Sequence, residues 1–324
     1  MNRAAIAIAV AAVIGGAACA GVRTPQVRNT PRPAGVSMWV EPTDIASRNL
    51  YYGPWGAENA PDPNGVYELV ELKHSGVNLG MTVKDAKGRE WSVKQPFPGN
   101  LDSEAPVEVT ISRLLSAVGY RQPPVYYLPS FKLKDDFGTH IETGGRFRLK
   151  HASLKEVGAW QWEDNPFVGT KEYQGLIVLL MLFNSTDLKN SNNSLYEHRD
   201  GDLVEHWYLA RDVGSALGDT NRIAPRKNHA PTFERTPFIV GRNNGWVEFA
   251  YTGWYQNLVW GRITPQEVVW ACSLLGQLSD AQLADAFRAG GFSPDNARRF
   301  ITAIKARTQQ GRAVGLNAAR DERN

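Results

Sequence analysis

The stretch NSTDLKNSNN, residues 184–193, decides the fold that this chain is expected to adopt. It follows the apolar run LIVLLMLF, residues 176–183, which predicts a buried helix. Two strand-like segments, residues 194–197 and 205–210, come next, and the second leads directly into Asp212 of the tetrapeptide RDVG. The sequence therefore predicts a buried helix, a polar loop, two strands and an Asp-x-Gly turn, in that order.

Three polar residues in this stretch, Asp187, Asn192 and Asp212, have the chemistry that phosphoryl transfer needs. That reaction uses a carboxylate beside the attacking hydroxyl, and further carboxylate or amide groups that hold the metal ions on the phosphates. A solvated turn is the alternative, because Asn and Asp are common between elements.

The pattern Asp-Leu-Lys-x-x-Asn, from Asp187 to Asn192, resembles the catalytic loop of protein kinases, and Asp212-Val-Gly resembles their Asp-Phe-Gly motif. The usual His-Arg before the aspartate is replaced by residues 185–186, Ser-Thr, which is closer to the atypical kinases of the HipA, phosphoinositide and secretory-pathway types. The resemblance implies that Asp187 is the catalytic base and that Lys189 neutralises charge on the transferred group. It also implies ATP and Mg²⁺ as cofactors, with Asn192 and Asp212 as the metal ligands.

Upstream of this stretch the sequence predicts five strands, with one helix over residues 103–119 after the third strand. The strands are expected at residues 66–72, 79–83, 90–94, 123–128 and 146–150. The resemblance makes these elements the small lobe of a kinase. The expected fold is therefore α+β and bilobal, with a small antiparallel five-stranded lobe carrying one helix and a mainly helical large lobe.

Lys94 ends the third strand, and the resemblance implies that it orients the phosphates and pairs with a glutamate of the helix. Glu108 is the expected partner, because it lies on or beside the buried stripe, where a glutamate is costly unless a cation meets it. Glu104, one turn earlier, is the alternative partner of Lys94. A third interpretation is that Glu108 is an exposed glutamate, which is favoured near the start of a helix. Gly76, in the turn of residues 74–78, would contact phosphate through backbone N–H groups, although a plain hairpin also explains that turn.

Residues 1–20 predict an export signal, with Arg3 before an apolar run. The tetrapeptide GAAC, residues 16–19, resembles a bacterial lipobox in which Cys19 would carry a lipid and attach the chain to a membrane. Cleavage without lipidation and an uncleaved anchor stay open. The expected organisation continues with a tether and N-terminal wrap, a small lobe and a large lobe, at residues 21–64, 65–152 and 153–324.

Composition and the lack of certain motifs reduce the number of functions to consider. A formal net charge of +3 over 324 residues gives no basic field for nucleic acid. The six His show no zinc-type spacing, and neither a phosphate-binding Gly-Lys-Ser/Thr loop nor a Gly-x-Ser-x-Gly elbow is found. The expected function is an exported, ATP-dependent phosphotransferase with an unknown hydroxyl acceptor. A catalytically silent kinase-fold binding module on the cell envelope, an unrelated exported structural protein, and a glycosidase using Asp187 and Asp212 are the alternatives.

Overall fold

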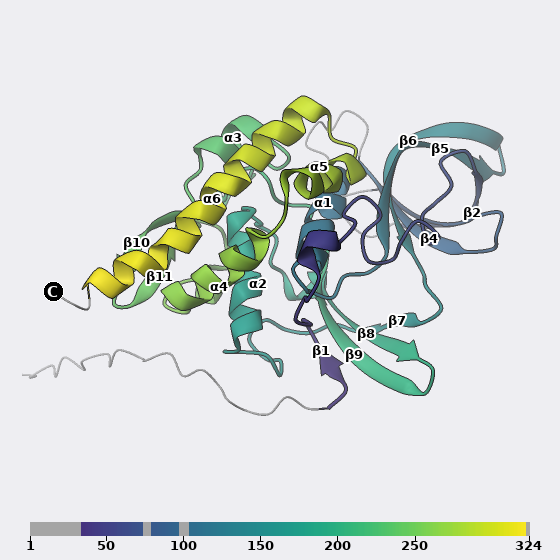
Figure 1. The fold of residues 1–324 in the computed structure, drawn as a ribbon. Helices are drawn as coiled ribbons and strands as arrows, with labels where there is room; N and C mark the ends of the chain where they lie inside the picture. The colour runs from purple at the N-terminus through teal and green to yellow at the C-terminus, as the bar shows by residue number, and fades with distance from the viewer. Residues whose placement is uncertain (1–33, 74–78, 97–103, 322–324) are drawn as a thin grey trace, which may run out of the picture.

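The computed structural model describes residues 34–73, 79–96 and 104–321. The predicted export signal with Cys19, and Gly76 in its turn, lie outside these residues. The fold is α+β, with a five-stranded β-barrel lobe followed by a mainly helical part, as Figure 1 shows. A second sheet lies at the junction of the two parts in that view.

The small lobe is a closed barrel in the order β2-β3-β4-β6-β5. All five predicted strands are present, but the sheet is not purely antiparallel, because β2 and β5 pair in parallel and close the barrel. Tyr67, Phe131 and Phe147 meet inside it with ring centroids 5.0–6.1 Å apart. The bounds are β2 (Val66–Lys73), β3 (Leu79–Lys84), β4 (Glu90–Gln95), β5 (Val125–Asp135) and β6 (Gly138–Leu149).

Helix α1 (Glu104–Ala117) follows β4, as predicted, and packs against the β5–β6 hairpin and against α5. The chain leaves the helix at Gly119, whose φ of +102° favours glycine. A Cβ at this position would meet the carbonyl oxygen of Val40 at 2.3 Å. The close approach of the N-terminal wrap therefore requires glycine here.

The second sheet has the order β1-β9-β8-β7. The polar loop of residues 184–193 leads into its strand β8. Its β8–β9 hairpin corresponds to the two predicted strands, with Asn193 opposite Ala210. Strand β7 pairs antiparallel with β8 at the edge of this sheet. The bounds are β1 (Val36–Ser37), β7 (Leu154–Gly158), β8 (Asn193–Asp200) and β9 (Leu203–Ala210).

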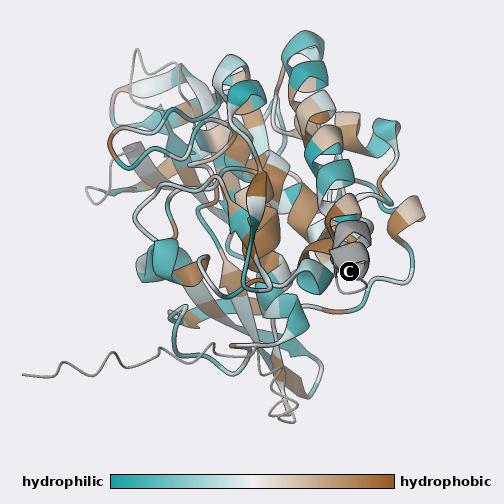
Figure 2. Ribbon diagram, turned by 90° about the vertical axis from the view of Figure 1, so that its left-hand side faces the viewer, coloured by the Kyte–Doolittle hydropathy of each residue, from teal (hydrophilic) through white to brown (hydrophobic). Residues whose placement is uncertain are grey.

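The helical part is built around α2 (Lys171–Leu182), which is buried from Glu172 onward and packs against α4 and α6. A helix that is apolar all round needs such a central position. In Figure 2 the hydrophobic colour gathers in the helices at the middle of the molecule. The other elements are α3 (Ala230–Arg235), β10 (Ile239–Asn243), β11 (Trp246–Phe249), α4 (Pro265–Leu275), α5 (Asp280–Ala289) and α6 (Pro294–Asp321), with 3-10 turns at Ile45–Ser47, Asn190–Asn192 and Gln256–Leu258.

Two helices of this part begin with local side-chain hydrogen bonds. Capping boxes start α4 at Thr264 and α5 at Ser279. Cys272 is a buried free thiol on α4, as expected of a core cysteine. Within the described ranges, no helix combines the length and the apolar character that a membrane crossing requires.

Arg307 of α6 fixes the end of the central helix. Its guanidinium donates to the carbonyl of Leu182 at 2.6 Å and to Asn184 Oδ1 at 2.9 Å. It also donates to the carbonyls of Phe233 at 2.7 Å and Thr236 at 2.6 Å. Burial lowers the pKa of Arg307 to about 9, so the group keeps its charge at neutral pH. This side chain joins α6, α3 and the start of the polar loop.

We expect Arg307→Met to lower the free energy of unfolding by about 3 kcal/mol or more, because it leaves several buried acceptors unsatisfied. Arg299→Met on the same helix is the matched control. Arg299 forms an exposed pair with Glu234, so its loss should cost about 1 kcal/mol or less. Urea unfolding measures both, and equal losses would contradict the role given to Arg307.

Candidate active site

Both ends of the polar loop are attached to the segment that follows β9. At one end, the Thr186 N–H donates to the carbonyl of Ser215 at 2.9 Å. At the other, the Arg211 N–H donates to the carbonyl of Asn192 at 3.2 Å. The loop that carries Asp187 is therefore held beside the segment that carries the predicted Asp-Val-Gly motif.

Within the loop, Asp187 is contacted by two of the residues predicted to work with it. The Asn192 side-chain amide donates to the Asp187 carbonyl at 2.8 Å, which fixes the backbone of the loop. Lys189 Nζ lies 3.1 Å from Asp187 Oδ2 in a partly exposed ion pair. The amide nitrogen of Asn192 makes this contact with the backbone, so its amide oxygen is available to bind a metal ion.

Asp212 meets Lys94 across the junction of the two parts. Lys94 Nζ lies 4.0 Å from Asp212 Oδ1 and 3.3 Å from Glu104 Oε2. Asp212 has φ of +53°, a left-handed backbone that non-glycine residues seldom adopt and that is concentrated at functional sites. One side chain from β4, one from α1 and one from the end of β9 therefore form a single cluster.

The structure corrects the predicted partner of Lys94. The carboxylate in ion-pair contact is that of Glu104, the alternative partner, whereas Glu108 Oε1 lies 3.0 Å from Nε of Arg146 on β6. Both side chains of the Glu108–Arg146 pair are almost fully buried. The position of Glu108 on the buried stripe of the helix predicted that a cation would meet it, and that cation is Arg146.

The pKa shifts follow from this crowding of charges. Burial lowers the pKa of Lys94, but the carboxylates of Glu108, Asp212 and Glu104 outweigh burial and leave it raised. Burial raises the pKa of Asp212, but Lys94 and the neighbouring arginines outweigh burial and leave it lowered. Lys94 is therefore a cation and Asp212 an anion at neutral pH.

The residues present fit a magnesium ion that is completed by phosphate oxygens. Mg²⁺ is commonly bound by one or two carboxylate or amide groups of the protein, together with substrate phosphates and water. Asp212 supplies an ionised carboxylate and Asn192 an amide oxygen. The described residues hold no group of three or more His, Cys, Asp or Glu arranged for a metal. A magnesium ion here would therefore need phosphate oxygens of a bound substrate to complete its coordination, as in a nucleotide site.

Sequence reasoning missed several charged residues around Asp212. Arg146, Arg148 and Arg211 all act on its carboxylate and help to lower its pKa. Lys227 lies 2.6 Å from Glu104 Oε1, so Glu104 is shared between two lysines. The alternation Arg146-Phe147-Arg148 placed both arginines on one face of a strand, but it gave no indication of what that face meets.

Two tyrosines in the segment after β11 are near enough to Asp187 to feel its charge. Burial raises the pKa of Tyr251 to about 12, and the charge of Asp187 adds to that rise. Burial and the same charge raise the pKa of Tyr255.

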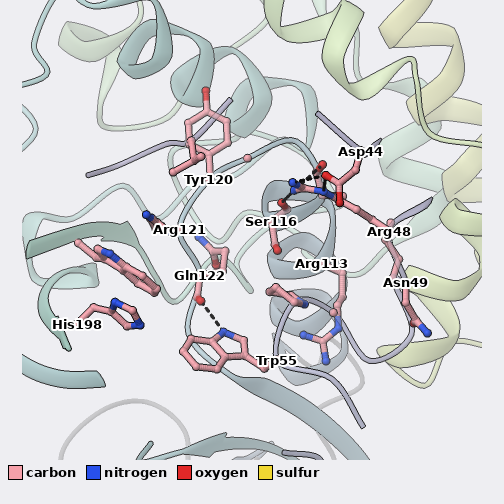
Figure 3. Close-up of a pocket in the computed structure, with 17 residues that line it drawn as sticks. Asp44, Arg48, Asn49, Trp55, Arg113, Ser116, Tyr120, Arg121, Gln122 and His198 are labelled. Carbon is pink, nitrogen blue, oxygen red and sulfur yellow. Dashed lines mark hydrogen bonds and ion pairs between the residues drawn. The ribbon is translucent and has the colours of Figure 1, made fainter. Parts of the chain in front are cut away.

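A separate cavity of about 490 Å³ lies between the N-terminal wrap, α1 and β9. Figure 3 shows Arg48 beside Asp44 on one side and His198 on the opposite side. Arg48 already pairs with Asp44 at 2.8 Å, and Arg121 with Glu205 at 3.1 Å. None of the described residues predicted for phosphoryl transfer lines this cavity, so it is distinct from the candidate site.

The structure is similar to three solved kinases. The proinflammatory kinase CtkA of Helicobacter pylori is 10% identical, with a TM-score of 0.45 over 78% of this chain and 98% of that chain. The Rio2 kinase of Chaetomium thermophilum, solved with ADP/Mg²⁺ and phosphoaspartate, is 13% identical, with a TM-score of 0.35 over 76% and 72%. The golgi casein kinase is 8% identical, with a TM-score of 0.36 over 79% and 74%. No protein-family model and no curated protein matches the chain.

We expect Glu108→Gln to lower the free energy of unfolding by about 3–5 kcal/mol, because it leaves the buried Arg146 without a counter-charge. Glu104→Gln should cost about 1 kcal/mol, because the ion pairs of Glu104 are partly exposed and Lys94 keeps Asp212. Denaturant titration of the two variants is the measurement. A larger loss for Glu104→Gln would show that the two carboxylates have the opposite roles.

Proposed function

We propose that this chain is a metal-dependent phosphotransferase of atypical kinase type that uses ATP as a donor. The observation that carries the proposal is the cluster of Lys94, Glu104 and Asp212, within 4.0 Å contacts, beside the loop that holds Asp187 and Asn192. Phosphoryl transfer depends mainly on positioning and on charge stabilisation, and this cluster supplies both.

Each residue has one task in the proposed reaction. Lys94, held by Glu104, binds and orients phosphate oxygens of the donor. The acceptor hydroxyl oxygen attacks the terminal phosphorus, an O–P bond forms, and the bridging P–O bond to the leaving diphosphate breaks. The Asp187 carboxylate accepts the hydroxyl proton. Lys189, 3.1 Å from Asp187, is placed to offset charge on the transferred group.

Asn192 and Asp212 would hold the magnesium ion. When bound, such an ion neutralises charge on the bridging and terminal phosphate oxygens. The lowered pKa of Asp212 keeps its carboxylate ionised, and therefore available as a ligand, at neutral pH.

We expect Asp187→Asn to bind Mg-ATP like wild type but to transfer phosphate about 10²–10⁴-fold more slowly, because it lacks the general base. Asp212→Asn should lose phosphate transfer and, unlike Asp187→Asn, should also lose magnesium-dependent stabilisation by ATP. Asp285→Asn, which removes an exposed carboxylate on α5, is the control. Thermal melting and transfer of labelled γ-phosphate are the two readouts.

The two readouts separate the alternatives. Binding without transfer in wild type would indicate a silent kinase-fold binding module. If Mg-ATP left the melting temperature of wild type unchanged, the proposed site would be rejected altogether.

We also propose that the protein is exported, since residues 1–20 have the pattern of an export signal. In a bacterial host we expect tagged wild type in the envelope fraction and Cys19→Ser released from it, because a lipid on Cys19 would be the anchor. Finding wild type in the cytoplasm at full length would contradict export.

A further inference from the structure

The barrel face that looks toward Asp212 is polar. Lys94 lies opposite Arg146, and Ser92 lies opposite Arg148, in the antiparallel register of β4 and β6. Since side chains alternate along a strand, these four share one face, while Phe147 between the two arginines points into the apolar barrel. This face of the barrel, beside the candidate site, therefore carries cations and a hydroxyl.

Two buried guanidinium nitrogens near Asp212, Arg148 Nη1 on β6 and Arg211 Nε after β9, have no hydrogen-bond partner among the described residues. Arg146 Nε is not available to a ligand, because it lies 3.0 Å from Glu108 Oε1. Buried polar groups in folded proteins are nearly always hydrogen-bonded, so two unsatisfied donors beside one carboxylate call for an explanation. An anion between them would supply the missing acceptors.

Positive charge slightly exceeds negative charge in the cluster around Asp212. Four cations act on its carboxylate, namely Lys94, Arg146, Arg148 and Arg211, and Lys227 adds a fifth through Glu104. The carboxylates in contact with these cations are Asp212, Glu104, Glu108 and Glu156. A metal on Asp212 would add positive charge, so the site is suited to a ligand with several negative charges.

The other side of the site is polar as well. Glu156 of β7 accepts hydrogen bonds from Ser194 at 3.0 Å and Tyr196 at 3.1 Å, both on β8, and from Arg211 at 2.6 Å. Sites for a heterocyclic base are usually lined by apolar and aromatic side chains that cover its faces. Among the described residues named on the two sides of the site, every side chain carries a charge or a hydroxyl group.

We propose, building on the phosphotransferase function, that the site selects its donor through the polyphosphate chain and not through the base. Inorganic tripolyphosphate would then serve as a donor alongside ATP. The acceptor oxygen bonds to a terminal phosphorus, the adjacent bridging P–O bond breaks, pyrophosphate leaves with the bonding electrons, and Asp187 takes the proton. Arg148 and Arg211 bind the phosphates beyond the one that Lys94 orients.

The test is a ligand series on the full chain in Mg²⁺, measured by calorimetry and thermal melting. ATP, GTP, CTP and tripolyphosphate should bind within about threefold of one another, and adenosine should not bind. Arg148→Met should weaken all four by about tenfold, the loss of one charge-assisted contact. Arg199→Met, an exposed arginine on β8, is the matched control and should change nothing.

The outcomes distinguish this proposal from the function on which it rests. Adenosine binding, or ATP at least tenfold tighter than tripolyphosphate, would overturn base-independent selection while leaving the phosphotransferase intact. Binding of none of the phosphates would overturn both. The wild-type series decides the matter even if Arg148→Met fails to fold.

Discussion

A lysine that is largely withdrawn from water needs negative charge around it, and this requirement holds the candidate site together. Lys94 comes from β4, Glu104 from α1 and Asp212 from the end of β9. Each belongs to a different part of the fold, so the charge balance of one ammonium group constrains how the barrel, the helix and the second sheet sit together. Removing Lys94 would leave Glu104 and Asp212 as two carboxylates without the ammonium group that they share.

The sequence predicted those features that depend on local signals. The helix over the apolar run before Asn184 and the two strands that follow the polar loop occur where they were expected. Each is set by neighbours within a few residues, through the periodicity of its apolar side chains. The five-strand lobe with one helix followed from the same kind of pattern.

What the sequence could not predict depends on contacts between distant segments. Glu104 and Glu108 lie one turn apart, and only the rotation of α1 against the barrel decides which of them meets Lys94. That rotation is set in part by Arg146 of β6, which forms an ion pair with Glu108. The parallel pairing of β2 with β5 is equally non-local, so strand patterns did not reveal that the sheet closes.

The contacts of Arg307 have a consequence for how the protein matures. They join α6 to Leu182 and Asn184, 125 and 123 residues earlier in the chain. Contacts of such separation form late, because a long segment must be ordered before they can close. The carbonyl of Leu182 and the side chain of Asn184 therefore gain this hydrogen-bond partner only once the last helix has been synthesised. A chain still emerging from the ribosome lacks these contacts at the start of the loop, and its loop is held by the segment after β9 alone.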